Sequence, residues 1–223
     1  MDLTVAMITL NEEGAVATVV NSIKLVVPEA EVLLVDSSTD QTAEIAESLG
    51  ARVIKQFPPI GYGPAMDLAL RSGNGDVVVT LDCDDTYPTE MIPTLRDMVL
   101  KEGWDVVDGN RLPRKPAAMA WPNYVGNWLL AALASLLFGR RLRDLHSGMR
   151  AYRASVLRQL RFDPKGAALP VELLLRPVRE GFRVTTVPID YRFRIGESTM
   201  KPIETMKWSL RRIARARFTG GSA

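Results

Sequence analysis

The stretch VTLDCDDTYP, residues 79–88, continues an apolar run and then ends it in a cluster of aspartates. In an extended strand, side chains two positions apart point to the same side, so Asp82 and Asp84 are predicted to face one ligand together. Two carboxylates that close repel each other, and a divalent cation such as Mg²⁺ or Mn²⁺ relieves the repulsion while sharing its oxygen ligands with a substrate phosphate. The alternative is a solvated acidic turn that leads into a helix, which the next residues also suit.

Around this stretch, strand-like and helix-like patterns alternate along the first half of the chain. Strands are predicted at residues 3–10, 31–36, 52–54, 76–82 and 105–109, and helices at 13–26, 41–49, 64–72 and 89–102. Such alternation is typical of βαβ units, and nearly continuous apolar strands are typical of a sheet that helices cover on both faces. The sequence therefore predicts a single α/β domain, Rossmann-like, with a central, mostly parallel mixed sheet flanked by helices.

Polar residues follow the predicted strands at the point where each strand ends. The segments are NEE at 11–13, DSSTD at 36–40, DCDD at 82–85 and DGNR at 108–111. Ligands of open α/β sheets bind outside the carboxyl ends of the strands, so these segments are predicted to form one site. Glu12 and Glu13 either open a helix, which the helix dipole favours, or accept hydrogen bonds from a nucleobase. Asp36 is expected to hold a ribose or a base.

The second half of the chain is less regular. Residues 111–123 are rich in proline and basic residues and are interpreted as a mobile loop. The elements predicted after it are a helix to residue 138, a short strand within 147–153, a helix at 170–180, strands near 183–187 and 189–194, and a basic helix at about 203–218. Alternate positions on the last strand would place Arg192 and Arg194 on one face, which suits a phosphate. The alternative is two solvated arginines on an edge strand.

Composition argues against several classes of protein. The formal net charge is only +2, so the total gives no support to nucleic-acid binding, and we expect none. Cys83 is the only cysteine and His146 the only histidine, which excludes a disulfide within the chain, a thiolate zinc site and a histidine-rich metal centre. The acidic first loop lacks the glycines and the lysine of a triphosphate-binding loop, which argues against a sugar-1-phosphate nucleotidyltransferase.

Two segments suggest contact with a membrane surface. Residues 124–138 are strongly apolar but fewer than the roughly 20 that span a bilayer. Trp121 and Trp128 suit a membrane interface, and the stretch 207–217 holds five basic residues and no acidic one, which suits anionic head groups. The alternative is a core helix and a solvated basic face. No secretory signal is recognised at the N-terminus, and the prediction is a cytoplasmic protein, peripheral on the cytosolic face of the membrane.

With these segments in order, the chain resembles the family 2 glycosyltransferases of the GT-A fold. Among them it is most similar to the polyprenyl-phosphate sugar synthases of the dolichol-phosphate mannose synthase type. The resemblance extends over residues 3–205 and rests on TLNEE, VDSSTDQT, DCDD, DGNR, DLHSGMRAYR and VPIDYRFRIGEST. It implies a nucleotide-sugar-binding half at residues 1–110, an acceptor-binding half at 111–205, and a basic C-terminal helix and tail at 206–223.

The resemblance also implies a reaction. A sugar of the mannose or glucose type would pass with inversion from a GDP- or UDP-linked donor to a polyprenyl phosphate, with Mg²⁺ or Mn²⁺ as cofactor. Asp82 and Asp84 would hold the metal and would be catalytic together with Arg194. The implied nucleotide-binding residues are Leu10, Asn11, Glu12, Asp36, Asp82 and Cys83, and those implied for the acceptor or its phosphate are Arg111, Arg192, Arg194 and Lys201. Leu10 departs from the family, which often has an aromatic residue there.

The need for a general base distinguishes two kinds of acceptor. A hydroxyl acceptor requires a base within hydrogen-bond reach, whereas a phosphomonoester, with a second pKa of about 6, arrives largely ionised. The candidates for a base are weak: Glu172 lies within a predicted helix, and His146 is interpreted as a satisfied or surface residue. Spacing alone does not show whether Asp144 lies near the acceptor, and Glu172 and Asp144 are the bases to test for a soluble acceptor. A phosphate acceptor is therefore favoured, and a soluble small molecule is the alternative.

Overall fold

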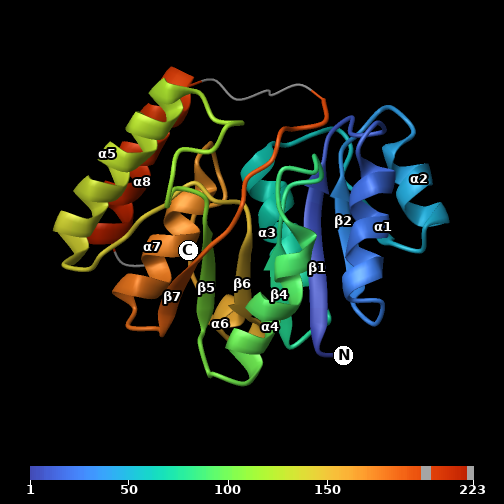
Figure 1. The fold of residues 1–223 in the computed structure, drawn as a ribbon, viewed down its shortest axis with the longest axis horizontal. Helices are drawn as coiled ribbons and strands as arrows, with labels where there is room; N and C mark the ends of the chain where they lie inside the picture. The colour runs from blue at the N-terminus through green and yellow to red at the C-terminus, as the bar shows by residue number, and fades with distance from the viewer. Residues whose placement is uncertain (197–201, 220–223) are drawn as a thin grey trace.

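The computed structural model describes residues 1–196 and 202–219, so Lys201 of the predicted phosphate-binding set lies outside the described residues. The strands are β1 (Leu3–Thr9), β2 (Glu31–Asp36), β3 (Arg52–Lys55), β4 (Val77–Thr80), β5 (Val106–Asn110), β6 (Arg150–Arg153) and β7 (Val184–Pro188). The helices are α1 (Val16–Val26), α2 (Thr42–Ser48), α3 (Tyr62–Ser72), α4 (Ile92–Leu100), α5 (Trp121–Phe138), α6 (Ala154–Gln159), α7 (Leu169–Arg179) and α8 (Pro202–Phe218). A 3₁₀ turn, η1 (Thr89–Met91), leads into α4, and Figure 1 shows the arrangement.

Within the described residues, seven strands form one sheet in the order β3-β2-β1-β4-β6-β5-β7. Strands β1 to β4 are parallel, because a helix connects each to the next, and β7 is parallel to β5. Only β6 runs antiparallel, between β4 and β5. The predicted mixed, mostly parallel sheet is confirmed, and the carboxyl ends of β1, β2 and β4 meet at one edge (Figure 1).

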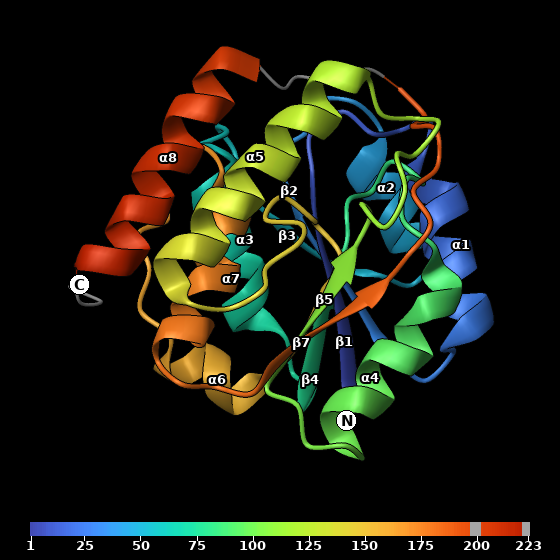
Figure 2. The same cartoon turned by 60° about the vertical axis from the view of Figure 1, so that its left-hand side comes forward.

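The inner strands bury side chains on both faces of the sheet. In β1, Ala6 packs in one apolar cluster while Val5 and Met7 pack in the other, because successive side chains of a strand alternate between faces. Figure 2 shows α1 and α4 on one side of the sheet and α3, α6 and α7 on the other. Both faces are therefore closed by helices, and the loops at the carboxyl edge are left to form a site.

The aspartates of the opening stretch do not lie on a strand. β4 ends at Thr80, whose hydroxyl donates to the carbonyl of Gly148 at 2.7 Å. The chain then turns, and Asp85 takes a positive φ of 62°. The prediction that Asp82 and Asp84 share a strand face is wrong, because the loop geometry, not a two-residue alternation, decides where they point.

The second strand predicted near the C-terminus is also absent. β7 ends at Pro188, and residues 189–194 are irregular. The amide of Arg192 donates to the carbonyl of Thr86 at 2.9 Å, and that of Ile195 donates to the carbonyl of Asp84 at 2.9 Å. This segment is thus fastened to the aspartate loop by isolated hydrogen bonds instead of a strand ladder, which brings Arg194 to the site.

Helices α5 and α8 lie side by side at one end of the molecule (Figures 1 and 2). α5 begins at Trp121, inside the predicted loop, because Pro122 in the first turn costs the helix no hydrogen bond. α8 begins at Pro202, so the predicted boundary between residues 205 and 206 falls inside one helix. Across the described ranges, no helix combines the length and the apolar character that a membrane crossing needs.

Candidate active site

The carboxyl edge of the sheet brings three carboxylates close to one guanidinium. Asp84 is buried in the loop after β4, and its Oδ1 accepts hydrogen bonds from the amide of Thr86 at 3.1 Å and from its hydroxyl at 2.6 Å. Oδ2 of Asp84 pairs with Nη2 of Arg194 at 2.5 Å. Asp82 and Glu12 are close enough to feel the charges of both residues. We call Glu12, Asp82 and Asp84 the carboxylate cluster.

Burial and mutual repulsion shift the titration of the carboxylate cluster. The pKa of Asp82 is raised to about 6, first by burial and then by the charge of Asp84. The pKa of Glu12 is raised to about 7, again by burial first and by Asp84 second. A Cβ on Gly148 would lie 3.0 Å from Oδ1 of Asp82, so glycine leaves the room that this carboxylate occupies. Such perturbed carboxyls in one place are typical of a functional site.

We expect Asp82→Asn to stabilise the protein in the absence of metal and nucleotide. A carboxyl whose pKa is higher in the folded than in the unfolded chain destabilises the fold above its unfolded pKa, and for Asp82 the penalty grows as the pH rises from about 4 to above 6. Because the side chain is partly exposed, we expect a gain of about 1–2 kcal/mol in unfolding free energy, or about 4 °C in Tm. Thermal denaturation should show the gain near pH 8 and little gain near pH 4. An equal gain at both pH values would contradict this origin.

The two arginines near the C-terminus pair with different carboxylates. Arg194 pairs with Asp84 in the site, whereas Arg192 pairs with Glu90 at the surface. The prediction that both project from one strand face is therefore wrong, because the backbone of residues 189–194 is irregular, while their phosphate-binding role stays a prediction. Arg194 is the one that belongs to the site.

Residues after β1 and β2 fasten two loops together beside the carboxylate cluster. The buried carboxylate of Asp36 accepts hydrogen bonds from the hydroxyls of Thr9 and Ser38, both at 2.6 Å. Asn11 takes a positive φ of 59°, and its Oδ1 accepts a hydrogen bond from the amide of Thr39 at 2.9 Å. Asp36 and Asn11 thus shape the place where the sequence predicts a nucleotide.

The other two residues predicted for the nucleotide differ in exposure. Leu10 is 48% exposed at the end of β1 and presents an apolar surface. Cys83 lies between the two aspartates, but its side chain is 2% exposed and packs in an apolar cluster. Burial also raises the pKa of the thiol well above its usual value. A contact of Cys83 with a nucleotide would therefore involve its backbone.

Arg111 and Asp144 form a buried ion pair. Nε and Nη2 of Arg111 donate to the two carboxylate oxygens of Asp144 at 2.7 and 2.9 Å, and the guanidinium lies 5.0 Å from the ring centre of Tyr191. Burial alone would raise the pKa of Asp144, but Arg111 holds it below its usual value. Asp144 is therefore committed to Arg111 and unsuited to accept a proton, and Arg111 itself braces the loop after β5.

Glu172 and His146, the other candidate bases, are also occupied by contacts within the protein. Glu172 is fully buried and pairs with Arg176 of its own helix and with Arg212 of α8. Nε2 of His146 lies 2.7 Å from the hydroxyl of Ser209 on α8. Burial lowers the pKa of His146 to about 4. These contacts attach α8 to the domain and leave neither residue suited to catalysis as a base.

Tyr62, at the start of α3, is a site residue that the sequence did not single out. Its side chain is 37% exposed, yet burial of the hydroxyl, and then the charge of Asp82, raises its pKa well above the usual value. The hydroxyl is therefore close enough to Asp82 to feel its charge. The only signal in the sequence was the pair of flanking glycines in GYG, which is common in ordinary turns.

The residues at the carboxylate cluster fit a divalent cation. Burial first and the charge of Asp84 second raise the pKa of Asp82, and a bound cation would favour its ionised form. The guanidinium of Arg194 already pairs with the second aspartate as a cation. Among the residues that the structure describes, no three acidic, histidine or cysteine side chains gather into a complete ligand set. Two aspartates suit an ion such as Mg²⁺ that takes its other ligands from water and from substrate phosphates.

Solved structures with the same fold define the class of protein. Glucosyl-3-phosphoglycerate synthase from Mycobacterium tuberculosis, in complex with Mn²⁺, UDP and phosphoglyceric acid, aligns with a TM-score of 0.79 over 99% of this chain and 80% of its own, at 23% identity. The same enzyme with Mg²⁺ and UDP aligns with a TM-score of 0.74 at 25% identity, over 99% of this chain and 81% of its own. The fold is that of the GT-A glycosyltransferases.

Sequence comparisons identify the family. Residues 4–161 match the model of glycosyl transferase family 2, and the chain belongs to that family of enzymes. Dolichyl-phosphate hexose transferase of Haloferax volcanii is 44% identical over 90% of this chain and 87% of its own. Undecaprenyl-phosphate mannosyltransferase of Micrococcus luteus is 31% identical over 86% of this chain and 84% of its own. The sequence-based recognition of the family is thereby confirmed.

Proposed function

We propose that this glycosyltransferase moves a hexose from a nucleotide sugar to a polyprenyl phosphate. The observation that carries the proposal is the carboxylate cluster. There Asp84 pairs with the guanidinium of Arg194, beside the loops that follow β1 and β2. The names of the two relatives, a dolichyl-phosphate hexose transferase and an undecaprenyl-phosphate mannosyltransferase, support the same acceptor class. The donor is a GDP- or UDP-linked sugar.

In this reaction Asp82 and Asp84 would hold Mg²⁺ or Mn²⁺ together with the donor diphosphate. When bound, the cation would neutralise the negative charge that develops on the leaving nucleoside diphosphate. The guanidinium of Arg194 lies beside the same two aspartates and is suited to bind phosphate oxygens. An oxygen of the acceptor phosphate would attack the anomeric carbon from the face opposite the leaving nucleoside diphosphate. This attack would invert the configuration of the anomeric carbon. The loops that Asn11 and Asp36 hold together would receive the nucleoside.

The state of the candidate bases supports a phosphate acceptor. Asp144 and Glu172 are buried in ion pairs, and His146 has a pKa of about 4. A phosphomonoester needs no such base because it is already ionised at neutral pH. For a hydroxyl acceptor, the base that the carboxylate cluster offers is Glu12, whose pKa is about 7. This second candidate predicts that Glu12→Gln abolishes transfer at every pH.

Exposed apolar side chains on α5 and α8 support docking on a membrane. On α5, Trp121 is 66% exposed and Leu136 is 81% exposed, and on α8, Ile203 is 76% exposed. Lys207 and Arg211 are exposed on α8 beside this apolar surface, which is the pattern of a helix that lies in a bilayer interface. Because anionic lipids are enriched in the cytoplasmic leaflet, we place the enzyme at the cytosolic face.

A transfer assay with matched acceptors tests the proposed function. Purified protein is given Mn²⁺ and either GDP-mannose or UDP-glucose, labelled in the sugar, with dolichyl phosphate, with dolichol or with 3-phosphoglycerate. We expect label in the organic phase for one donor with dolichyl phosphate and none with dolichol, which lacks the nucleophile. Transfer to 3-phosphoglycerate alone would contradict the lipid acceptor and leave the enzyme class intact.

A further inference from the structure

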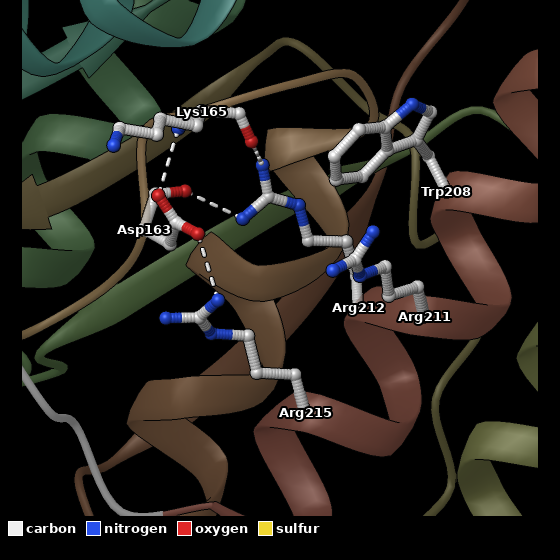
Figure 3. A pocket seen from close by; sticks show the side chains of 6 residues that line it. All are labelled: Asp163, Lys165, Trp208, Arg211, Arg212 and Arg215. Carbon is white, nitrogen blue, oxygen red and sulfur yellow. Dashed lines mark hydrogen bonds and ion pairs between the residues drawn. The ribbon is translucent and has the colours of Figure 1, made fainter.

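A basic pocket opens between α8 and the loop before α7, and it shares no residue with the carboxylate cluster. It measures about 200 Å³, and its lining residues are Asp163, Lys165, Trp208, Arg211, Arg212 and Arg215. Figure 3 shows the three arginines projecting from α8 toward the loop that carries Asp163 and Lys165. A second hollow of about 510 Å³ adjoins it along α8, shares Arg211 and Arg215, and reaches Phe218.

The floor of the pocket is held in place by buried contacts. Arg212 is 2% exposed, and its guanidinium donates to the carbonyls of Asp163, Lys165 and Ala167 as well as to Glu172. Gly166, with φ of +84°, passes so close to Trp208 that a Cβ would lie 2.2 Å from the indole ring. The loop and α8 are thus locked together, and the pocket has a defined shape before any ligand binds.

Positive charge in the pocket exceeds the negative charge available to balance it. Four cations and one carboxylate line it, and Glu172 beneath it pairs with Arg212 and, at 3.8 Å, with Arg215, so the excess positive charge belongs to Lys165 and Arg211. The carboxylate of Asp163 accepts from Arg215 at 2.7 Å and from the amide of Lys165 at 3.0 Å. Within residues 1–196 and 202–219, Arg211 stacks on Trp208 at 5.2 Å, but neither Arg211 nor the Lys165 ammonium makes an ion pair. Figure 3 shows the Lys165 ammonium directed away from the three arginines, so Arg211 is the cation of the pocket best able to bind an anion.

The position of the pocket identifies the kind of anion. Leu210, 44% exposed, precedes Arg211 on α8, and Phe218, 71% exposed, lies at the far end of the second hollow. Arg211 and Arg215 therefore lie close to exposed apolar side chains of α8, and a helix that docks its apolar side on a bilayer brings such cations near the lipid phosphates. An anionic lipid fits both features at once, because its acyl chains meet the apolar surface and its phosphate meets the guanidinium groups.

We propose that Arg211 and Arg215, at the edge of this pocket, bind the phosphate of an anionic phospholipid. The proposal rests on the membrane docking proposed above and adds to it a specific head-group site. The lipid is distinct from the substrate: it anchors α8 and does not receive a sugar. Lipid composition then decides how firmly the enzyme is held at the surface where its acceptor lies.

Vesicle flotation with a charge-reversed variant and a matched control tests this site. The vesicles contain phosphatidylcholine alone or mixed with phosphatidylglycerol. Arg211→Glu alters the pocket, and Arg158→Glu changes the same charge at an exposed position on α6. A basic residue near an anionic surface contributes about fivefold to binding, so Arg211→Glu should weaken binding to the mixed vesicles on the order of 25-fold. It should leave binding to phosphatidylcholine unchanged, and Arg158→Glu should resemble the wild type.

Each other outcome overturns the proposal in a different way. Equal binding of wild type to both kinds of vesicle would remove the head-group site and leave membrane docking intact. No binding of wild type to either would remove both, while the transfer assay still decides the chemistry. Calorimetric binding of glycerol 3-phosphate to wild type but not to Arg211→Glu, with flotation unaffected by the variant, would assign the pocket to a soluble phosphate.

Discussion

Asp84→Asn should lower kcat/KM for sugar transfer about 1,000-fold, because several kcal/mol of charge stabilisation at the leaving group are lost with the cation. The amide also loses the ion pair with Arg194, which the carboxylate makes at 2.5 Å. The shape of the loop should survive, since the amide oxygen still accepts from the amide and the hydroxyl of Thr86. Initial rates over a range of Mn²⁺ concentrations, with circular dichroism as a check of folding, measure the effect.

Asp85→Asn is the matched control for that substitution. Asp85 is the next residue, has the same side chain and takes a positive φ of 62°, which asparagine adopts as readily as aspartate. We expect it to retain activity within about threefold, because the residue lies outside the carboxylate cluster. Equal losses in the two variants would mean that the loop as a whole, and not the second aspartate of DCD, is what transfer requires.

Glu172→Gln should cause the largest loss of stability among single substitutions at polar residues. Glu172 is fully buried and balances Arg176 and Arg212, which are 1% and 2% exposed. Removing one member of a buried ion pair leaves an uncompensated charge, which costs about 3–5 kcal/mol and lowers Tm by about 10 °C in a chain of this size. The comparison is thermal denaturation of Glu172→Gln and of Glu180→Gln. Glu180 is an exposed residue that directly follows α7.

The same variant also tests whether Glu172 is only structural. If Glu172 acts solely by attaching α8, the folded fraction of Glu172→Gln retains kcat at low temperature, and its unfolding is the only defect. A loss of kcat on the order of 100-fold in protein that is still folded would instead be typical of a missing general base. That result would favour the soluble-acceptor alternative.

The sequence predicted best those features that depend on local pattern. The strand Glu31–Asp36 was predicted with its observed bounds, because a short apolar run between polar residues leaves little choice of where the strand begins and ends. The convergence of Asn11, Asp36 and Asp84 on one edge followed from the direction of parallel strands. The spacing of residues does not reveal which of them bind the nucleotide, the metal or the acceptor. Those roles came from the family resemblance, and they stay predictions.

The features that could not be predicted from the sequence depend on contacts between segments that are distant along the chain. Residues 189–194 alternate like a strand, but the amide of Arg192 donates to the carbonyl of Thr86, more than 100 positions away, and no pattern within the segment reports this. The basic stretch of α8 was interpreted as a surface for anionic head groups, with a solvated face as the alternative, yet Arg212 is buried against Glu172, 40 positions earlier. Tyr62 was missed for the same reason, because only folding brings its hydroxyl within range of the charge of Asp82.

Calorimetric titration of the donor tests the central claim most directly, namely that the carboxylate cluster binds a metal-bound sugar nucleotide. GDP-mannose and UDP-glucose are each titrated into wild type with Mn²⁺ and again with EDTA. The structure predicts that one donor binds with Mn²⁺ and that EDTA abolishes its binding, since Asp82 and Asp84 repel a bare diphosphate. Binding that is equally tight with Mn²⁺ and with EDTA would contradict the role given to both aspartates.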